Sequence, residues 1–80
     1  MERQLIPLVK VPLAGRGSVG SLCAKSHTRR RLQDLGFVPN TEVEVLHKSP
    51  AGNPAAYGLR GTVIALRDDE AGQIMVFYAF

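Results

Sequence analysis

The sequence predicts a mainly β protein, a small antiparallel barrel of five to six strands with one short α-helix and a helical turn. Two observations lead to this fold class. Short apolar segments, some with clean alternation of polar and apolar residues, are separated by turns rich in Gly, Pro and Asn. The connections between these segments are too short for the crossovers that parallel strands require.

The N-terminal segment, residues 5–13, has an apolar residue at every odd position, which predicts a half-buried first strand. Gly15, Arg16 and Gly17 then predict a turn, and residues 18–23 predict a second short strand with Val19 and Leu22 as its apolar members. The odd positions of the first segment are Leu5, Pro7, Val9, Val11 and Leu13.

A short helix is predicted after the second strand. Ser26 or Thr28 can serve as its N-cap, and Gly36 stands where a left-handed residue commonly ends a helix. Leu32 and Leu35 lie three positions apart, on one helical face, and we expect them to plug one end of the barrel.

Residues 41–45 alternate cleanly between polar and apolar side chains. This pattern predicts a strand with Val43 and Val45 inside and with Glu42 and Glu44 in water. Residues 49–54 have the composition of a loop.

Residues 57–60 and 62–66 predict two strands that turn at Gly61, and residues 67–72 predict one helical turn. The last segment, residues 74–80, is apolar on both faces. One face is expected to fill the barrel. The other, which includes Met75 and Phe77, is expected to meet a partner or a second copy of the chain, so a homo-oligomer is possible.

At 80 residues the chain is expected to form one domain, residues 1–80, with a shallow binding surface. Cys23 is the only cysteine, which excludes an internal disulfide and favours a reducing, cytoplasmic location. No apolar run approaches the length of a membrane span and no signal-like segment opens the chain, so no membrane insertion is expected.

Two sequence patterns that enzymes use were sought, and each requires a particular structural context. Residues 15–20 match the G-x-G-x-x-G pattern of dinucleotide sites, but a strand follows where that motif requires a helix, so the glycines are interpreted as turn residues. Nucleophilic catalysis needs a nucleophile, a base and an orienting group, and no local signature of such a set is present. We therefore predict no enzyme activity.

Positive charge is concentrated at the start of the predicted helix, on Lys25, Arg29, Arg30 and Arg31. With the helix N-terminus and its hydroxyls, these side chains can hold a phosphate or the carboxylates of a partner. The alternative is a solvated basic face, partly balanced by Asp34. A small nucleic-acid-binding barrel stays open as a further function, although the net charge of +3 is low for that class and nucleic acid is not the expected partner.

Residue types that bind metals occur, but their spacing is not a metal signature. We therefore predict no cofactor and no metal site within one chain. A metal held between two copies, and a metal-sensing domain, remain alternatives. The residues concerned are Cys23, His27, His47, Asp68, Asp69 and Glu70.

Residues 31–41 read R-L-Q-D-L-G-F-V-P-N-T, an order that resembles the R-L-x-x-L-G-φ-x-P-G-T pattern, with φ apolar, of the ferrous iron transport protein A (FeoA) family. The resemblance covers nearly the whole chain. Asn40 stands where the family usually has Gly, and Asn53 where it favours Asp. The matched residues that shape the fold are Leu32, Leu35, Gly36, Pro39 and Gly61, and further matches lie at residues 13–19, 43–45, 50–54, 60–67, 70–71 and 74.

The resemblance implies an SH3-like domain that is a cytoplasmic, non-catalytic accessory of bacterial ferrous iron uptake. Its implied partner is the cytosolic part of a membrane transporter with a GTPase domain. The resemblance supplies no catalytic residue. We expect docking through Lys25, Arg29, Arg30 and Arg31 together with Met75 and Phe77. The same domain is similar to the C-terminal domain of iron-dependent repressors, without their DNA-binding helices.

Overall fold

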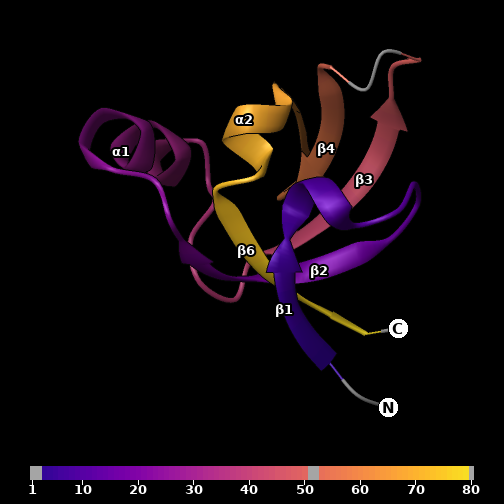
Figure 1. Cartoon of the computed structure of the whole chain (residues 1–80), viewed down its shortest axis with the longest axis horizontal. Helices are drawn as coiled ribbons and strands as arrows, with labels where there is room; N and C mark the ends of the chain where they lie inside the picture. Colours follow the sequence, from indigo (N-terminus) through magenta and orange to yellow (C-terminus); the bar gives the residue numbers. More distant parts are fainter. Residues whose placement is uncertain (1–2, 51–52, 80) are drawn as a thin grey trace.

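The computed structural model describes residues 3–50 and 53–79. These residues form one antiparallel sheet with two α-helices and a 3₁₀-helix (Figure 1). The elements in chain order are β1 (Arg3–Pro7), η1 (Leu8–Lys10), β2 (Arg16–Leu22), α1 (Ser26–Asp34), β3 (Glu42–Lys48), β4 (Ala55–Leu59), β5 (Thr62–Leu66), α2 (Asp68–Ala71) and β6 (Ile74–Ala79).

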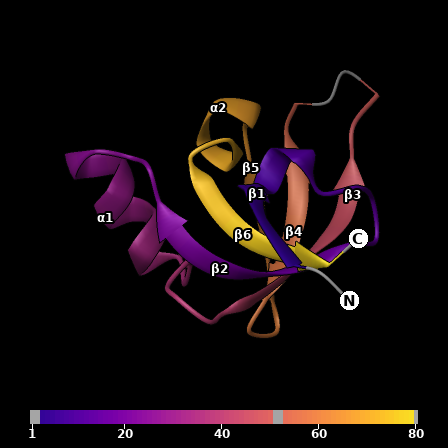
Figure 2. The same cartoon turned by 60° about the horizontal axis from the view of Figure 1, so that its bottom comes forward.

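The sheet has the strand order β1-β6-β2-β3-β4-β5, and every neighbouring pair is antiparallel. It curls around a core to which all parts of the chain contribute, as the sequence predicts for a small barrel. Because β1 pairs with β6, the two ends of the chain lie near each other (Figures 1 and 2). The fully buried large side chains are Tyr57, Phe37, Leu8, Leu32, Leu66, Ile74, Val11, Val19, Val43, Val45 and Val76.

The prediction of one strand over residues 5–13 is wrong. Strand β1 ends at Pro7, and a 3₁₀-helix with a hydrogen bond from Val11 N to Leu8 O follows. The 3₁₀ period of three places Leu8 and Val11 on one face, and both are fully buried. The odd-numbered Leu5 and Leu13, which strand alternation would bury, are 45% and 59% exposed.

Strand β2 begins at Arg16, so Arg16 and Gly17 are strand residues and not the predicted turn. Val19 and Leu22 are both buried although they are three positions apart, which places two residues of a regular strand on opposite faces. A β-bulge between Val19 and Ser21 resolves this, because the extra residue, Gly20, shifts the alternation by one. A Cβ on Gly20 would lie 2.8 Å from atoms of Leu5 and Phe77, so a larger residue here would displace these two side chains.

Helix α1 starts one residue after an extended N-cap, Lys25, and the described contacts include no side-chain cap for it. The predicted caps, Ser26 and Thr28, are therefore wrong. Gly36 has φ +111°, the left-handed conformation expected at the end of a helix. Leu32 is fully buried and Leu35 packs against the core, so the predicted apolar face does contact the barrel. The helix lies at one end of the long axis of the molecule (Figures 1 and 2).

Strand β3 confirms the alternation predicted for residues 41–45, with Val43 and Val45 fully buried and Glu42 exposed. Strands β4 and β5 form a tight hairpin. Both central residues of its turn, Arg60 and Gly61, have positive φ, which is the geometry that matches the twist of the flanking strands. Arg60 thus belongs to the turn and not to the predicted strand. Part of the predicted 49–54 loop lies outside the described residues.

Helix α2 occupies part of the predicted helical turn and leads into β6. Ile74 and Val76 of β6 are fully buried, whereas Phe77 is 41% exposed, so this strand does present apolar side chains on two faces. The final predicted strand residue, Phe80, lies outside the described residues.

Candidate functional site

The four cations of the predicted basic cluster, Lys25, Arg29, Arg30 and Arg31, differ in their contacts. Arg29 Nη1 donates a hydrogen bond to the carbonyl oxygen of Leu22 at 2.9 Å, and Arg31 forms an ion pair with Glu70 of α2. The exposed side chains of Lys25 and Arg30 have no hydrogen bond or ion pair within the described residues. Two of the four cations hold α1 in place, and two face solvent.

The other predicted contact residues lie on the outer face of the sheet. Phe77 of β6 is paired with Leu5 of β1, and residues paired across antiparallel strands place their side chains on the same face. The guanidinium carbon of Arg3 lies 5.1 Å from the centre of the Phe77 ring, a cation–π contact. Met75, two residues before Phe77, is half-buried on this face. We call Leu5, Met75 and Phe77 the β1–β6 patch.

The structure does not bring the two predicted surfaces together. Figures 1 and 2 place α1 at one end of the long axis, while β6 runs from the middle of the molecule toward the opposite end. Phe77 lies near that opposite end, opposite Leu5 of the N-terminal strand. Lys25 and Arg30 therefore form one surface and the β1–β6 patch another.

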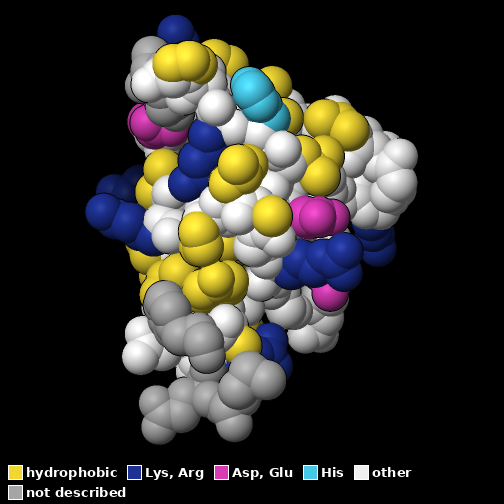
Figure 3. Space-filling view, turned by 90° about the vertical axis from the view of Figure 1, so that its right-hand side faces the viewer, with side chains coloured by type: hydrophobic (Ala, Val, Ile, Leu, Met, Phe, Trp, Pro, Cys, Tyr) yellow, Lys and Arg dark blue, Asp and Glu magenta, His cyan; other side chains and the backbone are white. Residues whose placement is uncertain are grey.

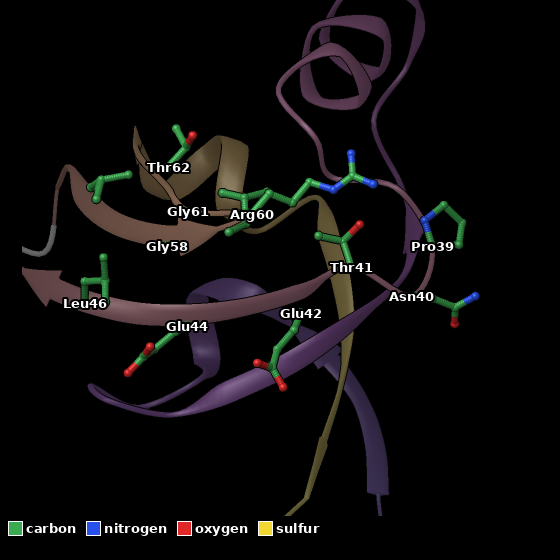
Figure 4. Close-up of a pocket in the computed structure, with 12 residues that line it drawn as sticks. Pro39, Asn40, Thr41, Glu42, Glu44, Leu46, Gly58, Arg60, Gly61 and Thr62 are labelled. Atoms are coloured by element: carbon green, nitrogen blue, oxygen red, sulfur yellow. The ribbon is translucent and has the colours of Figure 1, made fainter.

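A groove that sequence reasoning did not predict lies between β3 and the β4–β5 hairpin (Figure 4). Its volume is about 710 Å³ and it is open to solvent along its length. Leu46, Gly58 and Val63 form an apolar end. The remaining lining residues are Pro39, Asn40, Thr41, Glu42, Glu44, Leu59, Arg60, Gly61 and Thr62.

The apolar end of the groove depends on a second β-bulge. The pairing of β3 with β4 shifts between Val45 and His47, which leaves Leu46 as the extra residue, 43% exposed above Gly58. A Cβ on Gly58 would lie 2.9 Å from Leu46 Cδ1, so glycine keeps the groove floor low. The local sequence contains no signal that predicts this bulge, because Leu46 is an ordinary apolar strand residue in the sequence.

Carboxylates stand along the β3 side of the groove. Glu42 and Glu44 lie 4.0 Å and 3.7 Å from the guanidinium of Arg16 on β2. Because these groups are largely exposed, water screens the ion pairs and they contribute little to stability. The pKa of Tyr57 is raised above its usual 10.0 by burial and, second, by the negative charge of Asp68.

The residues that the structure describes include no group of three or more His, Cys, Asp or Glu side chains placed to hold a metal ion. Cys23, His27 and His47 are each exposed. Within the described ranges, no helix combines the length and apolar character of a membrane span.

The model of the FeoA domain matches residues 6–77, nearly the whole chain. The chain belongs to the FeoA family. This membership implies involvement in ferrous iron transport. No curated protein sequence is significantly similar to the chain.

Solved structures agree with the family assignment. A FeoA-like protein from Clostridium acetobutylicum shares 34% identity and a TM-score of 0.87, covering 100% of this chain and 92% of its own. The FeoA of Stenotrophomonas maltophilia, an SH3 domain protein solved with zinc, shares 34% identity and a TM-score of 0.78, covering 91% of this chain and 88% of its own. The six-stranded sheet described above is thus an SH3-like fold.

A manganese-dependent transcriptional repressor has the same fold at 15% identity, with a TM-score of 0.85 over 99% of this chain and 44% of the repressor. At this identity the likeness shows the fold alone. The zinc belongs to the structure of the Stenotrophomonas FeoA, and the absence of a cofactor in this chain stays a prediction.

Proposed function

We propose that this chain is a cytoplasmic, non-catalytic accessory protein that docks on the cytosolic part of a bacterial ferrous iron transporter and regulates its GTPase. The family membership supports the process, and the relative from Stenotrophomonas is described as possibly acting as a ferrous iron transport activating factor. The surfaces of this chain suit binding better than chemistry. The groove between β3 and the β4–β5 hairpin is open to solvent, whereas pockets for small molecules enclose most of the ligand.

The proposed docking mode is supported by a difference within the basic cluster, where two cations have internal contacts and two do not. Arg29 and Arg31 are engaged in contacts within the molecule, whereas Lys25, at the N-cap of α1, and Arg30, in the middle of the helix, are exposed cations without such contacts. The charge of Lys25 is opposed by the positive end of the helix dipole, and no described contact offsets that cost. Carboxylates of a partner would supply the missing counter-charge.

The β1–β6 patch is the second contact in this proposal. The patch consists of three partly exposed apolar side chains, and the cation of Arg3 lies against Phe77. Figure 3 shows the side of the molecule that lies at the right of Figure 1, where groups of hydrophobic side chains are separated by charged and polar ones. Mixed surfaces of this kind are typical of transient interfaces, whereas permanent dimers bury larger and more continuous apolar areas. We therefore favour a transient partner over a permanent homo-oligomer.

Binding to the purified cytosolic part of the transporter from the same organism tests the proposal by calorimetry. The double variant Lys25→Glu and Arg30→Glu should weaken binding by about tenfold or more, because two attractive charges become repulsive. Lys10→Glu, which reverses an exposed cation on η1, is the matched control and should bind as the unmodified chain does. Absence of binding at high micromolar concentration would contradict the proposal.

Phe77→Glu tests the second contact in the same assay, with light scattering to report any self-association. Loss of transporter binding from a monomeric protein supports the patch as a docking contact. A dimer that dissociates on this substitution, with transporter binding unchanged, would instead assign the patch to a second copy. Stronger binding to short RNA or DNA than to the transporter, with a steep salt dependence, would favour the nucleic-acid alternative.

A further inference from the structure

The groove between β3 and the β4–β5 hairpin lies on elements that the proposed transporter contacts do not use. It is lined by strand residues and by the hairpin turn, whereas the proposed contacts are on α1 and on the β1–β6 patch. The ligand of the groove can therefore be inferred independently of the proposed function.

The shape of the groove favours an extended chain over a compact ligand. Pockets for small molecules enclose most of the ligand surface, whereas this groove is open to solvent along its length. Its floor follows β3 and β4, and Figure 4 shows Leu46 and Gly58 toward one end, with Arg60, Thr41 and Asn40 toward the other. An extended peptide can lie along such a floor and place its side chains in turn against these positions.

The apolar end selects an apolar side chain. Val63 is 65% exposed and Leu46 is 43% exposed, and the Leu46 side chain lies over Gly58, which has no side chain of its own in that space. Val63 is paired with Gly58 across the hairpin, so Leu46 and Val63 form one exposed apolar surface at this end of the groove. Burying one aliphatic side chain here would cover apolar surface that now faces water.

The carboxylates select the neighbouring residues of the peptide. Glu42 and Glu44 border the groove on the β3 side, against one cation, Arg60, at the turn end. Arg16 faces the same carboxylates from β2, but at 3.7 Å and 4.0 Å in an exposed position it neutralises them only in part. The net charge of the chain is +3, yet screening over about 10 Å at 0.1 M salt leaves the groove governed by its own carboxylates.

The spacing of these groups sets the pattern. Glu42 and Glu44 are alternate residues of β3 and share a face at an interval of about 6.6–6.8 Å, and Leu46 follows them at the bulge, where this repeat is interrupted. An extended peptide has the same repeat as the two glutamates. We infer that the groove binds an extended peptide with one apolar side chain and, on one side of it, two basic side chains at alternate positions.

A titration of the isotope-labelled intact chain with a short N-acetylated peptide tests this inference. The probe consists of serines with one leucine and with lysines two and four residues from it. We expect the amide resonances of Leu46, Gly58 and Val63 to shift. The same peptide with glutamates in place of the lysines should bind about tenfold more weakly, because it repels Glu42 and Glu44.

Two variants locate the interaction. Val63→Lys removes the exposed apolar wall and adds a charge that repels the probe, so binding should fall about tenfold. Leu5→Lys makes the same change of charge at a similarly exposed apolar residue on the β1–β6 patch, and should leave binding unchanged. The double variant Glu42→Gln and Glu44→Gln keeps the size of both side chains and should weaken binding by about threefold to tenfold.

The inference is overturned if no resonance shifts at about 1 mM probe, a concentration that detects even a weak complex. It is also overturned if the shifts map to α1 or to the β1–β6 patch, or if the glutamate peptide binds as well as the lysine peptide. Retained transporter binding by Val63→Lys would show that the groove and the proposed docking surface are independent.

Discussion

The two helices of this chain are stabilised in opposite ways. Helix α2 carries Asp68, Asp69 and Glu70 in its first turn, where negative charge is favoured by the helix dipole, and Glu70 accepts a hydrogen bond from Arg67 N at 3.1 Å. Helix α1 has no acidic residue in its first turn and begins after a lysine. Local chemistry therefore favours the four-residue helix and opposes the nine-residue one.

Tertiary contacts compensate for this in α1. Leu32 is buried in the core, Arg29 bonds to the backbone of β2, and Arg31 pairs with Glu70, the same residue that caps α2. The basic residues of α1 therefore have two different roles: Arg29 and Arg31 hold the helix, and Lys25 and Arg30 face solvent. Substitutions can remove one role without the other. The predictions that follow test this division from the largest expected effect to the smallest.

Leu32→Ala should have the largest effect, because Leu32 is the fully buried side chain of α1. A buried leucine replaced by alanine costs about 2–5 kcal/mol of unfolding free energy. Urea denaturation measures the loss, and Gln33→Ala, at an exposed position of the same helix, is the control. A loss below about 1 kcal/mol would mean that α1 is held mainly by its polar contacts.

Lys25→Asp should make the protein more stable. Lys25 stands at the N-cap, where the charge of an aspartate would be favoured by the helix dipole that opposes the lysine. Because Ser26, the next residue, has φ +43° and not a helical value, the gain is expected from charge alone, about 0.3–1 kcal/mol of unfolding free energy. Lys10→Asp makes the same change of charge elsewhere.

The same Lys25→Asp variant should lose affinity for the transporter. Stability and binding would then move in opposite directions, as expected if the lysine is kept for a partner. A variant that is no more stable than the original chain would show that the start of α1 does not behave as a standard helix terminus.

A double-mutant cycle with Arg31→Gln and Glu70→Gln measures the link between the helices. Glutamine keeps an oxygen that can accept the bond from Arg67 N, so the cycle isolates the charge pair. We expect a coupling of about 0.2–1 kcal/mol, because Arg31 is half exposed and water screens the pair. The combination Arg30→Gln with Glu70→Gln should be additive, and a coupling of similar size there would contradict the assignment of separate roles to these arginines.

The smallest expected effect is a loss of stability at alkaline pH. The raised pKa of Tyr57 comes first from burial and second from Asp68 of α2. The raised pKa of Tyr57 stabilises the folded chain fully at pH values below 10.0, the usual pKa of tyrosine. This stabilisation is lost as the pH rises toward the pKa of Tyr57 in the folded chain, because the unfolded chain then releases the proton more readily.

Asp68→Asn should lower the pKa of Tyr57 without returning it to its usual value, since burial remains. A spectroscopic titration of tyrosinate, with Tyr57→Phe to assign the signal, measures this change. An unchanged titration would show that α2 does not influence the tyrosine.

Several elements could be predicted because local chemistry determines them. The alternation of Val43 and Val45 with the glutamates is enough to orient β3, and Gly36 and Gly61 both adopt the positive φ that favours glycine. The helical turn before β6 follows from its acidic start. Each of these signals lies within a few residues of the element that it specifies.

Other features are decided by residues far apart in the sequence. The bulges at Gly20 and Leu46 are shifts in the register between two paired strands, so each is recognised only from its partner strand. Likewise, Arg31 and Arg30 are adjacent and chemically identical, yet only Arg31 finds Glu70 across the fold. The groove at Leu46 and the division of the basic cluster therefore required the tertiary structure.

The sequence by itself thus determined the fold class, the order of most elements and the identity of the apolar face of α1, because these depend on the periodicity of side chains along one segment. Only the tertiary structure decided the phase of the N-terminal segment, the position of the groove and the cations left free for a partner. These depend on which segments meet in space, and the periodicity of a single segment carries no information about the segment that it will face.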